Sequence, residues 1–191
     1  MSRTRRVTAF LDASVLYSAP LRDLLMHLAM RDLFLARWSD RVHEEWIAAL
    51  LRNRSDLTPE RLARTRRLMD ENIDDALVRG YEPIVDQLTL PDPNDRHVLA
   101  AAIHGGASVI VTVNLRDFPT NVLTPYGVEA QHPDAFIRAR LDDQPDEFLA
   151  TLHELRLDLK NPPISMPELI TTFQRQGLTE TVAELRRLME V

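Results

Sequence analysis

The stretch that decides the fold is Leu90–Pro119, which reads LPDPNDRHVLAAAIHGGASVIVTVNLRDFP. Acidic side chains occupy its ends, with Asp92 and Asp95 near the start and Asp117 near the finish, whereas its middle is almost purely apolar. An apolar middle is expected to be buried, so the acids emerge where the chain reaches the edge of the core. The stretch therefore predicts a buried scaffold that presents carboxylates at one edge.

The middle of this stretch divides into a helix and a strand. An Ala-rich pattern predicts a helix over residues 94–104, and the glycines at 105–106 end it. The apolar run over 108–113 predicts a strand directly after that helix. His97 and His104 lie seven residues apart on the helix, and we expect both on its surface rather than at a ligand.

In the rest of the chain up to about residue 131, short apolar runs that predict strands alternate with longer helical patterns. Such alternation indicates βαβ units and a parallel sheet. The further strands are expected at 7–11, 33–38, 82–86 and 128–130, and the further helices over 20–30, after Ser39, and from Thr58 to about Val78.

The helix that begins at Thr58 segregates its charges, with arginines in the first half and acids in the second. A solvated helix face explains this pattern, and contact of the basic half with a phosphate backbone is the alternative. The arginines are Arg61, Arg64, Arg66 and Arg67.

From His132 onward the pattern is helical and contains no convincing strand. Ser165 and Glu168 match a capping box at the start of one of these helices. We therefore divide the chain into a domain over 1–131 and a helical C-terminal extension over 132–191 that packs on it.

Composition bounds the class of protein. The 191 residues include no Cys, which excludes disulfides, a thiol nucleophile and thiolate metal ligands. No apolar run is long enough to span a bilayer, and the segment MSRTRRVTAFLDAS is too short in its apolar part for a signal peptide. We expect a flexible start and a cytoplasmic protein without a membrane partner. The net charge of −6 argues against a non-specific nucleic-acid coat but not against a nuclease.

The acids of the chain are predicted to gather at one edge of the sheet. Asp12 ends the first strand and Asp117 follows the fourth, so the strand order 3-2-1-4-5 makes them neighbours where ligands bind. Asp92 and Asp95 start the helix on that same edge, and Glu45 lies near the start of the helix after the second strand. Each acid alone has a simpler explanation as a turn residue, a helix-start residue or a solvated side chain.

Grouped carboxylates repel one another and normally need a divalent cation to hold them together. Oxygen ligands without Cys favour Mg²⁺ (or Mn²⁺) over Zn²⁺. Such an ion lowers the pKa of a bound water and stabilises charge on a phosphate, which is the chemistry of phosphodiester hydrolysis. The chain has only five Gly and contains neither a Gly-rich phosphate loop nor a nucleophile elbow.

Four ordered motifs, FLDASVLYS, WSDRVHEEW, PDPNDRHVLAAA and VTVNLRDFP, resemble PIN-domain ribonucleases of the VapC-type toxin group. The resemblance covers about residues 7–130, and the tail resembles the helical extension of a larger subgroup. It implies an α/β/α sandwich, Mg²⁺- or Mn²⁺-dependent endonucleolytic cleavage of RNA, and a cognate antitoxin protein. It also implies the following roles: catalysis by Asp12, Glu45, Asp95 and Asp117; metal binding by Asp12, Asp92, Asp95 and Asp117; and substrate contacts by Asn114, Arg116 and Arg96.

Several alternatives stay open. A catalytically silent PIN-fold protein could hold a partner protein instead of cutting RNA. An Asp-nucleophile phosphatase would use Asp12, but such enzymes usually carry a second acid two residues on, where this chain has Ser14. Glu44 competes with Glu45 for the catalytic role. The helical extension could be a packed lid or a docking surface for antitoxin or for a second copy in a homodimer.

Overall fold

The computed structural model describes residues 6–190 and contains a five-stranded parallel sheet in the order β3-β2-β1-β4-β5. The predicted strand order is confirmed, and β1 lies in the middle between β2 and β4. The expected flexible start falls largely outside the described residues. The strands are β1 (Thr8–Leu11), β2 (Leu35–Ser39), β3 (Leu77–Val78), β4 (Val109–Val111) and β5 (Glu129–Gln131).

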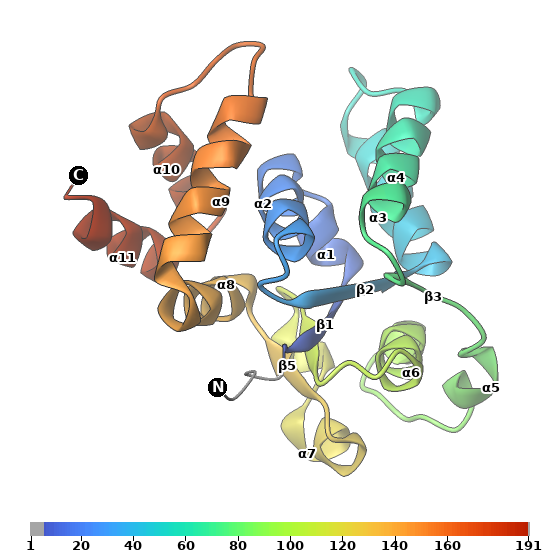
Figure 1. Cartoon of the computed structure of the whole chain (residues 1–191). Helices are drawn as coiled ribbons and strands as arrows, with labels where there is room; N and C mark the ends of the chain where they lie inside the picture. Colours follow the sequence, from blue (N-terminus) through green and yellow to red (C-terminus); the bar gives the residue numbers. More distant parts are fainter. Residues whose placement is uncertain (1–5, 191) are drawn as a thin grey trace.

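Helices cover both faces of the sheet, as Figure 1 shows with the sheet nearly edge-on. One face carries α1 (Ala13–Leu16), α2 (Ala19–Met30), α3 (Asp40–Asn53) and α4 (Pro59–Asn72). The other carries α5 (Glu82–Val85), α6 (Arg96–His104) and α7 (Thr120–Leu123). The connecting segments contain three short 3₁₀ turns, η1 (Pro93–Asp95), η2 (Leu115–Asp117) and η3 (Thr124–Tyr126).

Local capping explains why the longer helices of the first face begin where they do. The side chains of Ser18, Ser39 and Thr58 each accept a hydrogen bond from a backbone N–H in the first turn of α2, α3 and α4. Large side chains such as Phe10 and Trp38 of the central strands are completely buried between the layers. Burial of this apolar surface is the main term that holds the sandwich together.

The prediction for the third strand was wrong. The strand is Leu77–Val78, which pairs with β2, whereas residues 82–85 form the short helix α5. Pro83 lacks a backbone N–H, so it fits the first turn of a helix better than a sheet ladder. The helix from Thr58 also ends earlier than expected, because the chain leaves helical geometry at Ile73 and Asp75 has a φ of 59°.

Steric and backbone constraints explain why two glycines follow α6. A Cβ on Gly105 would lie 2.7 Å from Cγ2 of Val78 and 3.0 Å from the carbonyl oxygen of Ala101. Gly106 adopts a φ of 65°, a left-handed conformation that glycine tolerates best. The pair therefore allows α6 to end against β3 and the chain to turn into β4.

The C-terminal extension is helical, as its sequence pattern predicted, and the capping box at Ser165 is present. The helices are α8 (Pro133–Asp143), α9 (Pro145–Asp158), α10 (Met166–Arg175) and α11 (Thr179–Met189).

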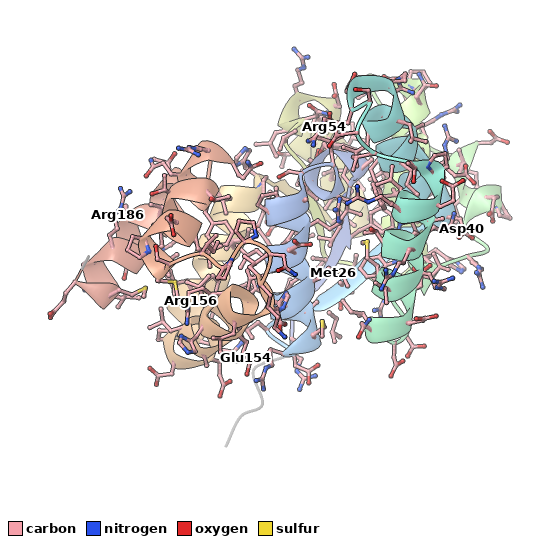
Figure 2. All side chains as sticks on the ribbon, turned by 90° about the horizontal axis from the view of Figure 1, so that it is seen from above. Met26, Asp40, Arg54, Glu154, Arg156 and Arg186 are labelled. Atoms are coloured by element: carbon pink, nitrogen blue, oxygen red, sulfur yellow. The ribbon has the colours of Figure 1, made fainter. Side chains whose placement is uncertain are left out.

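The extension is held against α2, which lies between the extension and the α3–α4 pair in the view from above (Figure 2). Phe136 of α8 meets Phe34 edge-on with ring centroids 5.0 Å apart, and Glu154 of α9 forms an ion pair with Arg31. No helix within residues 6–190 is both long and apolar enough to cross a membrane.

Candidate active site

Asp12 stands at the carboxyl end of the central strand and is held on both carboxylate oxygens. Its Oδ1 accepts a hydrogen bond from the backbone N–H of Ala13 at 2.8 Å. Its Oδ2 accepts from the hydroxyls of Ser14 at 2.6 Å and Thr112 at 2.8 Å. Only 7% of Asp12 is exposed, so this carboxylate is fixed where β1 and β4 end side by side.

Asp95 shares its surroundings with three other carboxylates. The pKa of Asp95 is raised to about 6, mainly by burial and then by the negative charges of Asp12, Asp92 and Asp117, whereas His97 opposes the rise. Electrostatic coupling of this kind requires the four acids to lie near one another. The structure thus brings together Asp12, Asp92, Asp95 and Asp117, from three separate loops at one edge of the sheet.

The loops on either side of Asp12 are short and internally bonded. Oδ1 of Asp92 accepts a hydrogen bond from the N–H of Asn94 at 2.8 Å and caps η1. On the other side, the N–H of Asn114 donates to Oγ1 of Thr112 at 3.0 Å. Because Thr112 also donates to Asp12, it couples the loop before Asp117 to the end of β1.

The three residues predicted to contact the substrate differ in exposure and in the hydrogen bonds that they already make. Asn114 is exposed, and the side chain of Arg116 is 91% exposed with its Nε 4.0 Å from Oδ1 of Asp117. Arg96 instead turns back onto its own loop, where its Nε donates to the carbonyl oxygen of Pro93 at 3.0 Å. Asn114 and Arg116 are therefore exposed, without a close hydrogen-bond partner for the Arg116 guanidinium among the described residues, whereas one of the five guanidinium N–H groups of Arg96 is already engaged.

Glu45 is half-buried and contacts α6 through His97, whereas Glu44 is exposed. Oε1 of Glu45 lies 2.8 Å from Nε2 of His97, although the direction of the contact is not that of a hydrogen bond. The surface position expected for His97 was wrong, since the residue is 1% exposed. Its helix, α6, contacts β1, β2 and β4 and is buried on more than one side.

Sequence reasoning missed three side chains at this edge. Ser14 and Thr112 bind Asp12, and His97 contacts Glu45. The spacing of Ser14, two residues after Asp12 at a helix start, is a signal that could have found it. Thr112 and His97 carry no such local signal, because their roles depend on which strands and helices become neighbours.

The donor set at this edge suits a hard divalent cation, because it consists of carboxylate oxygens that repel one another without one. Within residues 6–190, no three His, Asp or Glu side chains are arranged to hold a metal ion directly. The choice of Mg²⁺ or Mn²⁺ for this edge stays a prediction from the chemistry of the oxygen ligands.

The sheet order, the helices on both faces and the acids at the carboxyl edge define an α/β protein of the PIN class. A family model described as PIN domain matches residues 8–116, more than half of the chain, and the chain belongs to this family. No solved structure gives a significant match.

The comparison also extends to the tail and to one relative. Residues 133–187 match a model described as the VapC50 C-terminal domain. The chain is 38% identical over 113 residues to the "Putative ribonuclease VapC50" of Mycobacterium tuberculosis. The aligned segment spans 59% of this chain and 66% of that protein, just under two thirds of its length.

A buried polar network holds α3, the helix that carries Glu45. Nε1 of Trp46 donates to Nδ1 of His43 at 3.0 Å, which leaves the ring proton on Nε2, 3.1 Å from Oδ1 of Asp70. Nε1 of Trp38 donates to the same oxygen at 2.8 Å. The network therefore ties α3 to β2 and α4 through one carboxylate.

This network predicts a loss of stability in mild acid. Burial lowers the pKa of His43 below its ordinary value, and the charge of Asp70 only partly offsets this. As pH falls below about 6.5, the unfolded chain binds a proton that the folded chain resists, so folding is disfavoured. The fall in Tm between pH 7 and pH 5, followed by circular dichroism, should be smaller in His43→Gln than in the wild type. Equal falls would show that His43 does not titrate in this way.

Proposed function

We propose that this protein is a metal-dependent endoribonuclease and the toxin component of a toxin–antitoxin system. The observation that carries the proposal is the carboxyl edge of the sheet, where Asp12 is fixed by hydrogen bonds beside the end of β4 and where the charges of Asp12, Asp92 and Asp117 act on Asp95. Such a concentration of negative charge favours a divalent cation. Membership of the PIN family and the likeness to a protein named as a ribonuclease support RNA as the substrate.

The four clustered acids, Asp12, Asp92, Asp95 and Asp117, would hold Mg²⁺ or Mn²⁺. When bound, the cation would lower the pKa of a water molecule and stabilise negative charge on the phosphate. The hydrogen bonds from Ser14 and Thr112 keep the carboxylate of Asp12 aimed at this edge. Preorganisation of this kind avoids the cost of arranging charges during the reaction.

Glu45 would orient the attacking water, and Asp12, Glu45, Asp95 and Asp117 would be the catalytic residues. The water attacks phosphorus in line, the bond from phosphorus to O3′ breaks, and the leaving oxygen takes up a proton. The products carry a 3′-hydroxyl and a 5′-phosphate. Asn114 and Arg116 are exposed beside the acids and would contact the phosphate, with Arg96 as a further contact.

The phosphatase alternative is disfavoured by position 14, which offers a hydroxyl in place of the second acid that such enzymes usually carry. A cognate antitoxin would be the protein partner of the toxin, and the acid edge is the surface that an inhibitor needs to cover.

Incubation of the purified protein with a mixed RNA pool tests the proposed function. We expect cleavage with Mg²⁺ or Mn²⁺, none with EDTA, and recovery when excess metal is restored. The new ends should be substrates for a 5′-phosphate-dependent exonuclease. Hydrolysis of p-nitrophenyl phosphate without RNA cleavage would support the phosphatase instead, and RNA left intact with every metal would support a silent binding module.

A further inference from the structure

A groove of about 680 Å³ lies apart from the acid edge, between the start of α2 and the α3–α4 pair. Leu50 and Leu62 form part of its lining, and Gln176 of the C-terminal extension reaches it and accepts a hydrogen bond from Ser18. Four arginines also line the groove, which is unusual in a chain whose net charge is −6. They are Arg22, Arg54, Arg61 and Arg64.

The structure sorts the arginines of α4 into two groups. Arg66 forms an ion pair with Asp40, and Nε of Arg67 lies 3.9 Å from Oε1 of Glu71. Arg61 and Arg64 face the groove instead, and neither side chain has an ion-pair partner within residues 6–190. Two exposed guanidinium groups without an ion-pair partner among the described residues therefore stand over the same groove.

A third guanidinium, that of Arg22, is buried in the groove wall. Arg22 is 7% exposed, its Nη1 donates to the carbonyl oxygen of Leu16 at 2.7 Å, and its guanidinium carbon lies 4.9 Å from the centre of the Trp46 ring. Its Nε is buried and has no hydrogen-bond acceptor among the residues that the structure describes. A buried cation that lacks one acceptor strengthens the attraction of the groove for an anion.

Two helices connect the acid edge to the groove. Asp12 and Tyr17 stand at the two ends of α1, so a helical rise of about 1.5 Å per residue separates them by about 7.5 Å along the helix axis. Glu45 and Leu50 are also five residues apart on α3, which again amounts to about 7.5 Å. Along both α1 and α3, a proposed catalytic residue is therefore only five residues from a residue that lines the groove.

We propose that this groove binds a phosphate of the RNA strand outside the scissile bond, through Arg61 and Arg64 with Arg22 beneath them. The inference rests on the proposed function. Guanidinium groups bind phosphate through paired hydrogen bonds. The groove offsets the repulsion between RNA and an otherwise acidic protein, and Arg54 contributes less because it is bound on two nitrogens by Asp56.

Binding of a fluorescein-labelled single-stranded RNA in EDTA tests the groove without requiring cleavage. The double variant Arg61→Gln/Arg64→Gln should bind about tenfold more weakly at low salt, and the slope of log K against log salt should shrink by about 0.7, the value for one lost phosphate contact on a single strand. The matched control is Arg52→Gln/Arg67→Gln, which removes the same charge from α3 and α4 outside the groove lining. Unchanged thermal unfolding shows that each variant is folded.

Equal loss of binding and slope in both double variants would overturn the proposal, because it would show a general charge effect. Wild-type RNA affinity in the groove variant would overturn it as well, and loss of binding to a protein partner alone would then assign the groove to that partner. A protein that binds RNA through the groove but cleaves none with any metal would leave the groove supported and refute the proposed nuclease. The two inferences therefore fail separately.

Discussion

Replacement of Asp12 by Asn is expected to lower metal-dependent RNA cleavage by at least about a hundredfold while the fold persists. The lost charge stabilises a bound divalent cation, whose contribution to the reaction is several kcal/mol, and each 1.36 kcal/mol corresponds to a factor of about ten in rate. Asn has the shape of Asp, and one of its atoms can still accept hydrogen bonds in place of the carboxylate. Multiple-turnover cleavage of a labelled RNA, with product ends sequenced, measures the loss.

The matched control for this variant is Asp86→Asn, which removes one negative charge from an exposed position at the end of α5. It should cleave RNA as the wild type does. Calorimetric titration of Mg²⁺ or Mn²⁺ separates two causes of lost activity, because Asp12→Asn should weaken metal binding whereas Asp86→Asn should not. Full activity in Asp12→Asn would remove the central ligand from the proposed site and with it the proposed mechanism.

The parts of the fold that could be predicted from sequence are those that depend on residues close together in the chain. The strands β1 and β4 are apolar runs, and Asp12 and Asn114–Asp117 follow them. Once the strand order was assumed, these polar residues could be placed together at the carboxyl edge of the sheet. The helix starts at Ser39 and Thr58 followed from capping chemistry, which depends only on residues a few positions apart.

The parts that could not be predicted depend on tertiary neighbours. β3 has only two residues, too few to carry an alternating pattern, and it exists because Leu77 and Val78 pair with β2. His97 looks like a surface residue on a short helix, yet α6 is buried against three strands. The arginines of α4 look alike in sequence, and only the positions of Asp40 and Glu71 show which of them are already paired.

The catalytic roles of the acids stay predictions, but the structure adds a physical reason for treating them as one unit. Separate turn residues would have no need to influence one another, whereas Asp95 responds to three other carboxylates. The contact between Glu45 and His97 adds the fifth acid through α6, the same helix that begins at Asp95. A change at any one of these residues should therefore alter the others, so their effects on cleavage should not add.

A second large effect is expected in the C-terminal extension, where Asp134→Ala should lower the free energy of unfolding by about 3 kcal/mol. Oδ2 of Asp134 accepts from the N–H of Glu180 at 2.8 Å, and Oδ1 accepts from the N–H and the hydroxyl of Thr181 at 2.9 and 2.7 Å. α11 has no side-chain cap of its own. Asp134 of α8 therefore caps α11 from another helix, and its charge also suits the positive end of the α11 dipole.

Removal of this carboxylate leaves buried donors without an acceptor, since Asp134 is 7% exposed and Thr181 is completely buried. For a chain of this length, the loss corresponds to a fall in Tm of roughly 10 °C. Asp142→Ala is the matched control on the same helix, because Asp142 is half-exposed and forms only a surface ion pair with Arg138. That variant should lose less than about 1 kcal/mol. Equal shifts in the two variants would contradict the capping role.

The same variant tests whether residues 132–191 behave as a unit separate from the nuclease domain. Hydrogen exchange should report faster exchange of the backbone amides of α11 in Asp134→Ala, because its first turn loses the cap. If the extension is a separate unit, RNA cleavage below the unfolding transition should stay close to that of the wild type, and amides of β1 and β4 should keep their protection. Exchange that speeds up equally in α11 and in the central strands would show instead that the extension and the sheet unfold as one cooperative structure.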